Sequence, residues 1–151
     1  MPRARAAMTV PGLAPEAEAL WYDPQRWASW IDGFGHVARL DDSWPRAGAV
    51  LDWDSKPGGR GRVREKVLAY EARSGQELAV EDERLRGTQA VSFEPVDDGV
   101  LIALELRYEL KQSNPLTPLT DLLFIRRALR ESLRRSLQRF ARERRSEIEM
   151  T

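Results

Sequence analysis

The chain of 151 residues contains no cysteine and a single histidine, and these absences remove several kinds of chemistry. Without a thiol, the protein forms no disulfide, uses no thiolate nucleophile and holds no zinc or iron–sulfur cluster through sulfur. Histidine is the usual general base at neutral pH, but His36 begins an expected strand with no partner motif nearby. We expect His36 to be a surface residue, and we expect neither a metal site nor a cofactor.

Long apolar runs are also missing. No segment approaches the roughly 20 apolar residues that cross a bilayer, and no apolar signal segment follows the two arginines near the N-terminus. With 42% hydrophobic and 32% charged residues, the composition is that of a folded globular domain. We expect one cytoplasmic domain over residues 1–151, with no internal repeat and no linker.

The formal net charge is zero, but arginines gather toward the end of the chain. Residues 116–145 contain nine arginines and three acidic residues, a balance of +6. Such a segment can dock on anionic lipid or on nucleic acid. The alternative is a solvated helix face, which we favour because arginine outnumbers lysine 21 to 3 throughout the chain. We expect no nucleic-acid partner.

Apolar and polar residues alternate over residues 100–110 (VLIALELRYEL), which predicts a long strand with one buried face. Asp97-Asp98-Gly99 is expected to turn the chain into it from a strand over 89–96, with the glycine at positive φ. Similar patterns predict strands over 3–10, 36–42, 49–56, 61–73 and 77–86 and a turn at 57–59. Consecutive hairpins of this kind build an antiparallel sheet.

Helical patterns occupy two places. Residues 14–34 indicate two short helices, interrupted at Asp23-Pro24 because proline ends the preceding turn. Leucines at three- and four-residue steps over 119–145 predict an amphipathic helix about 40 Å long, capped by Thr117-Pro118 or Thr120-Asp121. We expect an α+β fold in which this helix covers the concave face of the curved sheet, an arrangement that easily leaves a cavity.

Three segments together resemble a known family: APEAEALWYDPQRWASWIDGF, the strand pair SFEPVDDGVLIALELRYEL and the arginine-rich last helix. They are similar to the polyketide cyclase/dehydrase-like members of the START/birch-pollen-allergen superfamily (SRPBCC), over roughly residues 3–145. The resemblance implies the helix-grip fold, a curved antiparallel sheet of about six to seven strands around a long C-terminal helix, with two short helices after the first strand. It is informative about the fold and almost silent about the substrate.

Trp27 and Trp30 raise the question of what they cover, because tryptophan buries a large apolar area. In a helix-grip fold they would pack where the short helices, the sheet and the long helix meet. Phe34 would follow near the mouth of the cavity. The other candidates are inward-facing aromatic or apolar residues and one arginine that could anchor an acidic ligand group. The full set of expected ligand-binding residues is Trp30, Phe34, Trp53, Arg84, Leu104, Leu106, Tyr108, Leu129 and Leu133.

The acidic run Glu81-Asp82-Glu83 falls on the strand expected over 77–86, so that Glu81 and Glu83 would share a face. A carboxylate turned inward would have a raised pKa and could act as an acid or base. The alternative is that all three are solvated at an edge strand. No nucleophile, paired acid–base signature or phosphate loop identifies a catalytic residue.

Two hypotheses follow for function. The first is binding of a small, largely hydrophobic ligand, lipid-, polyketide- or aromatic-like, in the cavity between the sheet and the last helix. The second is an enzyme of the aromatase/cyclase kind, which would close a polyketide-like chain without a cofactor because the cavity supplies orientation and proton transfer. We favour binding narrowly, and leave open whether the protein forms a homodimer.

Overall fold

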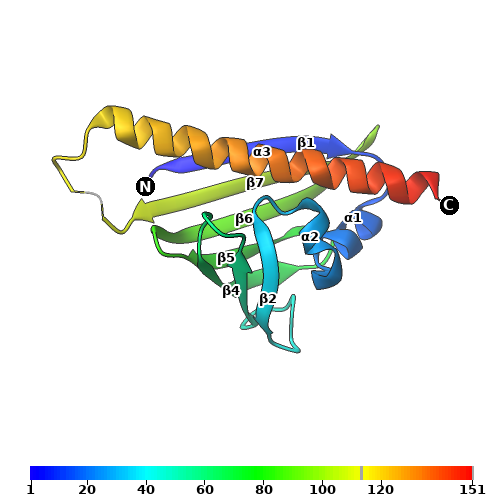
Figure 1. Cartoon of the computed structure of the whole chain (residues 1–151). Helices are drawn as coiled ribbons and strands as arrows, with labels where there is room; N and C mark the ends of the chain where they lie inside the picture. Colours follow the sequence, from blue (N-terminus) through cyan, green and yellow to red (C-terminus); the bar gives the residue numbers. More distant parts are fainter. Residues whose placement is uncertain (113, 151) are drawn as a thin grey trace.

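The computed structural model describes residues 1–112 and 114–150, and a single long helix crosses one face of a curved sheet in it (Figure 1). The described strands form one antiparallel sheet in the order β1-β7-β6-β5-β4-β3-β2. This confirms the predicted α+β helix-grip fold. The elements in chain order are β1 (Arg3–Val10), α1 (Ala14–Trp21), η1 (Pro24–Arg26), α2 (Trp27–Trp30), β2 (Phe34–Leu40), β3 (Val50–Ser55), β4 (Arg62–Glu71), β5 (Gly75–Glu81), β6 (Leu85–Val96), β7 (Gly99–Leu110) and α3 (Leu119–Glu149).

Strand β7 lies between β1 and β6, next to the edge of the sheet along which α3 runs. Its alternate side chains from Val100 to Tyr108 are buried, as the alternation predicts. Gly99 takes φ +144° in the hairpin before it, and a Cβ there would meet the carbonyl oxygen of Val10 at 2.0 Å. Glycine is therefore required at this turn, both for its conformation and for the close approach of β1.

The prediction of one strand over 77–86 is wrong. Strand β5 ends at Glu81, and Asp82 turns the chain because its carboxylate accepts the N–H groups of Arg84 and Leu85 at 2.8 and 3.0 Å. Strand β6 then begins at Leu85. The acidic run is consequently split by a turn, so that Glu81 and Glu83 share no strand face.

The ends of two other elements also differ from expectation. Helix α3 begins at Leu119 as predicted, but its N-cap is Pro118 without a capping side chain, so neither Thr117 nor Thr120 caps it. The hydroxyl of Thr117 instead accepts the N–H of Asn114. The helix continues past 145 to Glu149, and the strand expected over 36–42 lies at 34–40.

An aromatic cluster joins the short helices to α3. The ring centroid of Trp21 lies 4.4 Å from that of Trp30 and 5.1 Å from that of Phe140, and Trp30 lies 5.1 Å from Phe140. The indole N–H of Trp27 donates to the carbonyl oxygen of Trp21 at 2.8 Å. Such tilted and edge-to-face pairs add to the stabilisation from area burial. Trp27 and Trp30 are thus largely buried at the junction expected from the sequence.

A second attachment of α3 is polar and centres on Asp32, in the segment between α2 and β2. The Asp32 N–H donates to the hydroxyl of Ser136 at 2.9 Å, and its carboxylate accepts from Ser132 at 2.8 Å, Arg135 at 3.0 Å and Arg139 at 3.3 Å. Burial disfavours the charged carboxylate, but the hydrogen bonds and the two arginines outweigh it, and the pKa of Asp32 lies below its usual value. We call these five residues the Asp32 clamp.

We expect Asp32→Ala to lower the free energy of unfolding by about 2 kcal/mol near neutral pH, because hydrogen bonds to a charged group are lost. Since the folded-state pKa is depressed, the electrostatic part of this stabilisation is present above about pH 4 and is lost as the pH falls through the folded-state value. Urea denaturation across this range measures both effects. Asp42→Ala, at an exposed position, is the control, and an equal loss in the two variants would contradict the role of the clamp.

Candidate functional site

A cavity of about 90 Å³ lies between the concave face of the sheet and α3. All five tryptophans of the chain line it, four of them largely buried and Trp44 half-buried. They come from α1, α2, the loop after β2 and β3, so residues distant in the sequence form one aromatic wall. Helix α3 supplies the opposite wall through Ser132, Leu133 and Ser136. An enclosed, mainly apolar cavity is the usual setting of a small-molecule site.

Three polar side chains of the sheet also line the cavity: Glu65 of β4, Gln76 of β5 and Gln89 of β6. Gln76 donates to the carbonyl oxygen of Pro45 at 3.0 Å. The amide of Gln89 has no hydrogen-bond partner within residues 1–112 and 114–150. Polar groups with spare hydrogen-bonding capacity in an apolar wall can fix the orientation of a ligand.

Glu65 lines this cavity together with one other acidic residue, Asp32, and is only 9% exposed. Burial raises its pKa, and the charge of Arg60 and a long hydrogen bond of 3.4 Å from the Trp53 indole N–H oppose the rise only in part. The protonated form is thereby favoured, and a protonated carboxyl can donate a hydrogen bond as well as accept one.

Arg60 closes one side of the cavity from the loop between β3 and β4. Its Nε donates to the buried Asp82 at 2.8 Å, and its guanidinium carbon lies 5.5 Å from the centre of the Trp53 ring. The pairing holds the pKa of Asp82 below its usual value despite the opposing effect of burial. The turn that splits the acidic run thus also orients the arginine over the cavity.

Four of the residues expected from the sequence line the cavity: Trp30, Trp53, Leu104 and Leu133. Phe34 is buried beside it, 5.2 Å from Trp53 between ring centroids, and does not line it. Contact of any of these residues with a ligand remains a prediction.

The other four expected residues lie elsewhere. Leu106 and Tyr108 are buried in a separate cluster, against which Leu129 packs, toward the other end of β7. Arg84 lies exposed in the turn after β5, because the strand expected there ends earlier. His36 is 72% exposed and its Nε2 lies 3.0 Å from a carboxylate oxygen of Asp54, in agreement with the expected surface position.

Sequence reasoning missed Glu65, Gln76, Gln89 and Arg60. A signal for Glu65 was present: it stands between Val63 and Val67, so it occupies an inward position of an alternating strand. No such signal exists for Arg60, whose position depends on Asp82 of another hairpin.

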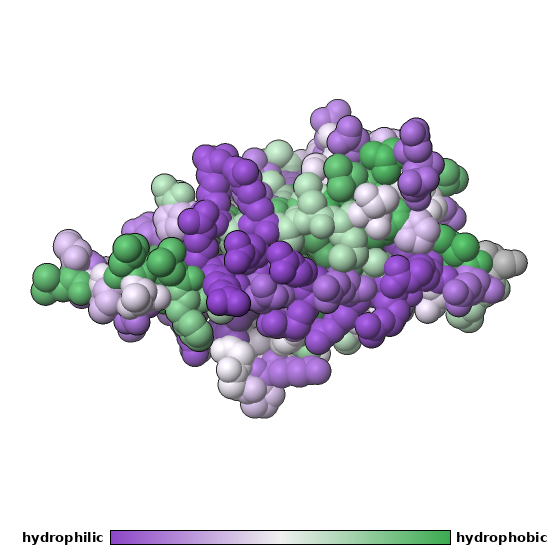
Figure 2. All heavy atoms as spheres, turned by 90° about the horizontal axis from the view of Figure 1, so that it is seen from above, coloured by the Kyte–Doolittle hydropathy of each residue, from purple (hydrophilic) through white to green (hydrophobic). Residues whose placement is uncertain are grey.

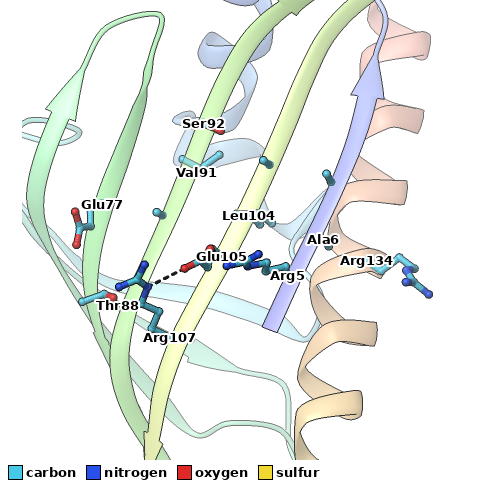
Figure 3. Close-up of a pocket in the computed structure, with 13 residues that line it drawn as sticks. Arg5, Ala6, Glu77, Thr88, Val91, Ser92, Leu104, Glu105, Arg107 and Arg134 are labelled. Carbon is cyan, nitrogen blue, oxygen red and sulfur yellow. Dashed lines mark hydrogen bonds and ion pairs between the residues drawn. The ribbon is translucent and has the colours of Figure 1, made fainter. Parts of the chain in front are cut away.

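A larger hollow, of about 860 Å³, lies on the face of the sheet opposite α3 and is open to solvent (Figure 3). Small side chains such as Ala90 and Ala103 form its floor. Some of the charged groups around it pair with each other: Glu105 lies 2.9 Å from Arg5 and 2.7 Å from Arg107. A shallow surface of this kind does not enclose an apolar molecule, so the interior cavity is the better candidate.

The part of the chain that the structure describes contains neither a membrane-spanning helix nor a cluster of metal ligands. None of its helices is both long enough and apolar enough to span a bilayer. No group of three or more His, Asp or Glu side chains within it is placed to hold a metal ion.

We expect Glu65→Gln to stabilise the protein near neutral pH and to have little effect at about pH 4. The pKa of Glu65 is raised on folding, so its burial is tolerated below the unfolded-state value and becomes unfavourable as the pH rises toward the folded-state value. Thermal melts across this range test the assignment. Glu77→Gln, at an exposed position of β5, is the control, and a gain independent of pH would show that folding leaves the pKa of Glu65 unchanged.

The sequence matches a family profile described as "Polyketide cyclase / dehydrase and lipid transport" over residues 1–144. No curated protein is significantly similar in sequence. Similar solved structures include the di-domain ARO/CYC StfQ from the steffimycin biosynthetic pathway, at 18% identity and a TM-score of 0.74 over 95% of this chain and 51% of StfQ. TTHA0849 from Thermus thermophilus has 17% identity and a TM-score of 0.72 over 96% of this chain and 98% of its own.

A third similar structure is DynU16, from the dynemicin biosynthetic locus, at 17% identity and a TM-score of 0.66 over 93% of this chain and 46% of DynU16. The chain thus spans about half the length of StfQ and of DynU16. At these identities the similar structures show a shared fold. Because the family profile covers nearly the whole sequence, the chain belongs to the polyketide cyclase/dehydrase and lipid transport family of the SRPBCC superfamily.

Proposed function

We propose that the protein binds a small, largely hydrophobic molecule in the cavity between the sheet and α3. The observation that carries this proposal is the wall of five tryptophans, to which Leu104 and Leu133 add apolar surface. A family described by lipid transport and by polyketide chemistry supports a ligand of this class. Burial of apolar ligand surface in such a wall supplies the main driving force for binding.

The volume of the cavity limits what it holds in this conformation. Sites that bury drug-sized molecules have about 300–1,000 Å³, whereas this cavity has about 90 Å³. A ligand larger than a small ring therefore requires lining side chains to move outward. Among the lining residues, Trp44, Arg60 and Leu133 are only half-buried, so their side chains have room to do so.

The polar groups of the cavity indicate which polar group the ligand carries. Glu65 in its protonated form offers a donor, and the amide of Gln89 offers both a donor and an acceptor. A carbonyl or hydroxyl oxygen at one end of an otherwise apolar ligand would satisfy these groups, which a pure hydrocarbon would leave unpaired. Such a ligand agrees with the biosynthetic pathways named for StfQ and DynU16.

A second candidate function is an enzyme of the aromatase/cyclase kind, and the presence of Glu65 and Arg60 in one cavity favours it. In an aldol closure, the carbon next to one carbonyl loses a proton to solvent water, the resulting carbanion attacks a second carbonyl carbon, and the second carbonyl oxygen takes a proton from a general acid that is reprotonated from solvent. Glu65 is placed to give that proton, and the guanidinium of Arg60 to stabilise the developing negative charge. No cofactor enters this scheme.

Binding is tested first by native mass spectrometry of the purified protein, which detects a retained small molecule, and by thermal shift with phenol and indole. A ligand that binds only the folded state raises the melting temperature. We expect Leu133→Trp to fill the cavity and to abolish both signals. Leu129→Trp, one turn earlier on α3 but outside the cavity, should retain them. Equal loss in both variants, or no retained molecule and no shift in the wild type, would refute the cavity as a binding site.

Catalysis is tested with a linear diketone whose closure to a hydroxy ketone, followed by loss of water, gives a conjugated cyclic enone that is detected by its ultraviolet absorbance. We expect the wild type to accelerate closure and Glu65→Gln to lose a factor of about 100 or more, because an amide cannot transfer the proton. The same variant is expected to keep ligand binding, since glutamine retains a donor and an acceptor. Binding without any acceleration by the wild type would leave the binding function and remove the enzymatic one.

A further inference from the structure

Large apolar side chains are exposed where α3 begins. Leu116 is 90% exposed, Leu119 69%, Leu123 53% and Phe124 73%. The chain before α3 projects beyond the sheet, and apolar side chains gather at this end of the molecule (Figures 1 and 2). Exposed large apolar residues that gather in one place usually mark an interaction surface rather than a random feature.

Arginines continue the same side of the helix. The steps from Leu119 to Leu123, Arg126, Arg130 and Arg134 are three or four residues, which places these five on one face. Figure 2 shows hydrophilic side chains in a band along the helix beside the apolar end.

Arg134 pairs with Glu131 at 3.3 Å, but the arginines nearer the start of the helix lack acidic partners in the part of the chain that the structure describes. Within the described residues, Arg127 and Arg130 form no ion pair, and Arg126 donates to the carbonyl oxygen of Arg3 at 2.9 Å rather than to a carboxylate. Arg3 and Arg130 also meet in a surface hollow next to the start of β1. The positive charge is therefore available to an external partner. We call the seven residues Leu116, Leu119, Leu123, Phe124, Arg126, Arg127 and Arg130 the α3 start surface.

We infer that the α3 start surface docks on the surface of a phospholipid bilayer that contains anionic lipids. Leucine and phenylalanine enter the boundary between headgroups and acyl chains, while arginines beside them meet the lipid phosphates and the negative surface potential. The complementarity of charge and the projecting position of the apolar side chains both suit a bilayer, which accepts a convex surface. Docking of this kind needs no ligand in the cavity and is independent of the proposed function.

Two other partners fit less well. Nucleic acid would attract the arginines but would leave the four exposed apolar side chains without a role. A second copy of the chain, paired through the same surface about a two-fold axis, would bring Arg126, Arg127 and Arg130 of each copy against one another. Like charges brought together in this way oppose association, whereas anionic lipid neutralises them.

The experiment is co-sedimentation with vesicles of phosphatidylcholine and phosphatidylglycerol, compared with vesicles of phosphatidylcholine alone. We expect binding to the mixed vesicles that weakens with added salt, and much weaker binding to the neutral ones. Arg127→Gln/Arg130→Gln should weaken binding about 30-fold, from about one kcal/mol for each arginine. Leu119→Gln/Leu123→Gln should weaken it by about tenfold or more.

The matched control is Arg142→Gln/Arg145→Gln, two exposed arginines of the same helix. Arg142 lies about 18 Å further along α3 than Arg130 at 1.5 Å per residue, beyond the screening length of about 8 Å at physiological salt. We expect this variant to bind like the wild type, and thermal melts confirm that each variant is folded. No vesicle binding, equal loss in the control, loss of binding with the arginine pair but not with the leucine pair, or self-association through the leucines would each overturn the inference.

Discussion

The attachment of α3 to the segment around α2 is the constraint on which the rest of the structure depends. An open sheet can bury one of its faces only if another element covers that face, and here α3 crosses it. Trp30 packs on Phe140, and the Asp32 clamp holds the turns of α3 that precede Phe140 through Ser132 and Arg135. Both contacts join residues about a hundred positions apart, so the sheet, the short helices and the cavity exist together only when this attachment forms.

The sequence predicts elements where one local pattern suffices. The alternation over 100–110 and the leucine repeat from 119 each place apolar residues on one side of an element and polar residues on the other. Both elements are found. The turn at Asp82 was missed because the residues around it continue the polar pattern of a strand and include neither glycine nor proline. Only the hydrogen bonds that the Asp82 carboxylate accepts from the following N–H groups reveal the turn, and these form only in the folded backbone.

The residues of the candidate site, like the elements of the fold, could be predicted only in part. Trp30, Trp53, Leu104 and Leu133 could be nominated because large apolar residues on inward faces gather around any enclosed space. Whether such a residue borders the cavity or the separate cluster around Tyr108 depends on the twist of the sheet, which periodicity does not encode. The inward position of Glu65 could be predicted from the alternation of its strand. A carboxylate at a position where the pattern requires an apolar side chain is informative because it breaks the pattern.

The same helix also determines where the cavity can change its size. In addition to the Asp32 clamp, Arg26 pairs with Glu143 at 2.8 Å and with Glu147 at 3.4 Å. Helix α3 is therefore held by residues on both sides of α2. The side of the cavity formed by Arg60 has fewer attachments, because Arg60 pairs with Asp82 through Nε and otherwise only lies over the face of Trp53. A movement of Arg60 with the loop between β3 and β4 can therefore enlarge the cavity while α3 stays in place. A ligand that displaces Arg60 would have to replace its contact with the indole, which favours ligands with an aromatic or conjugated face.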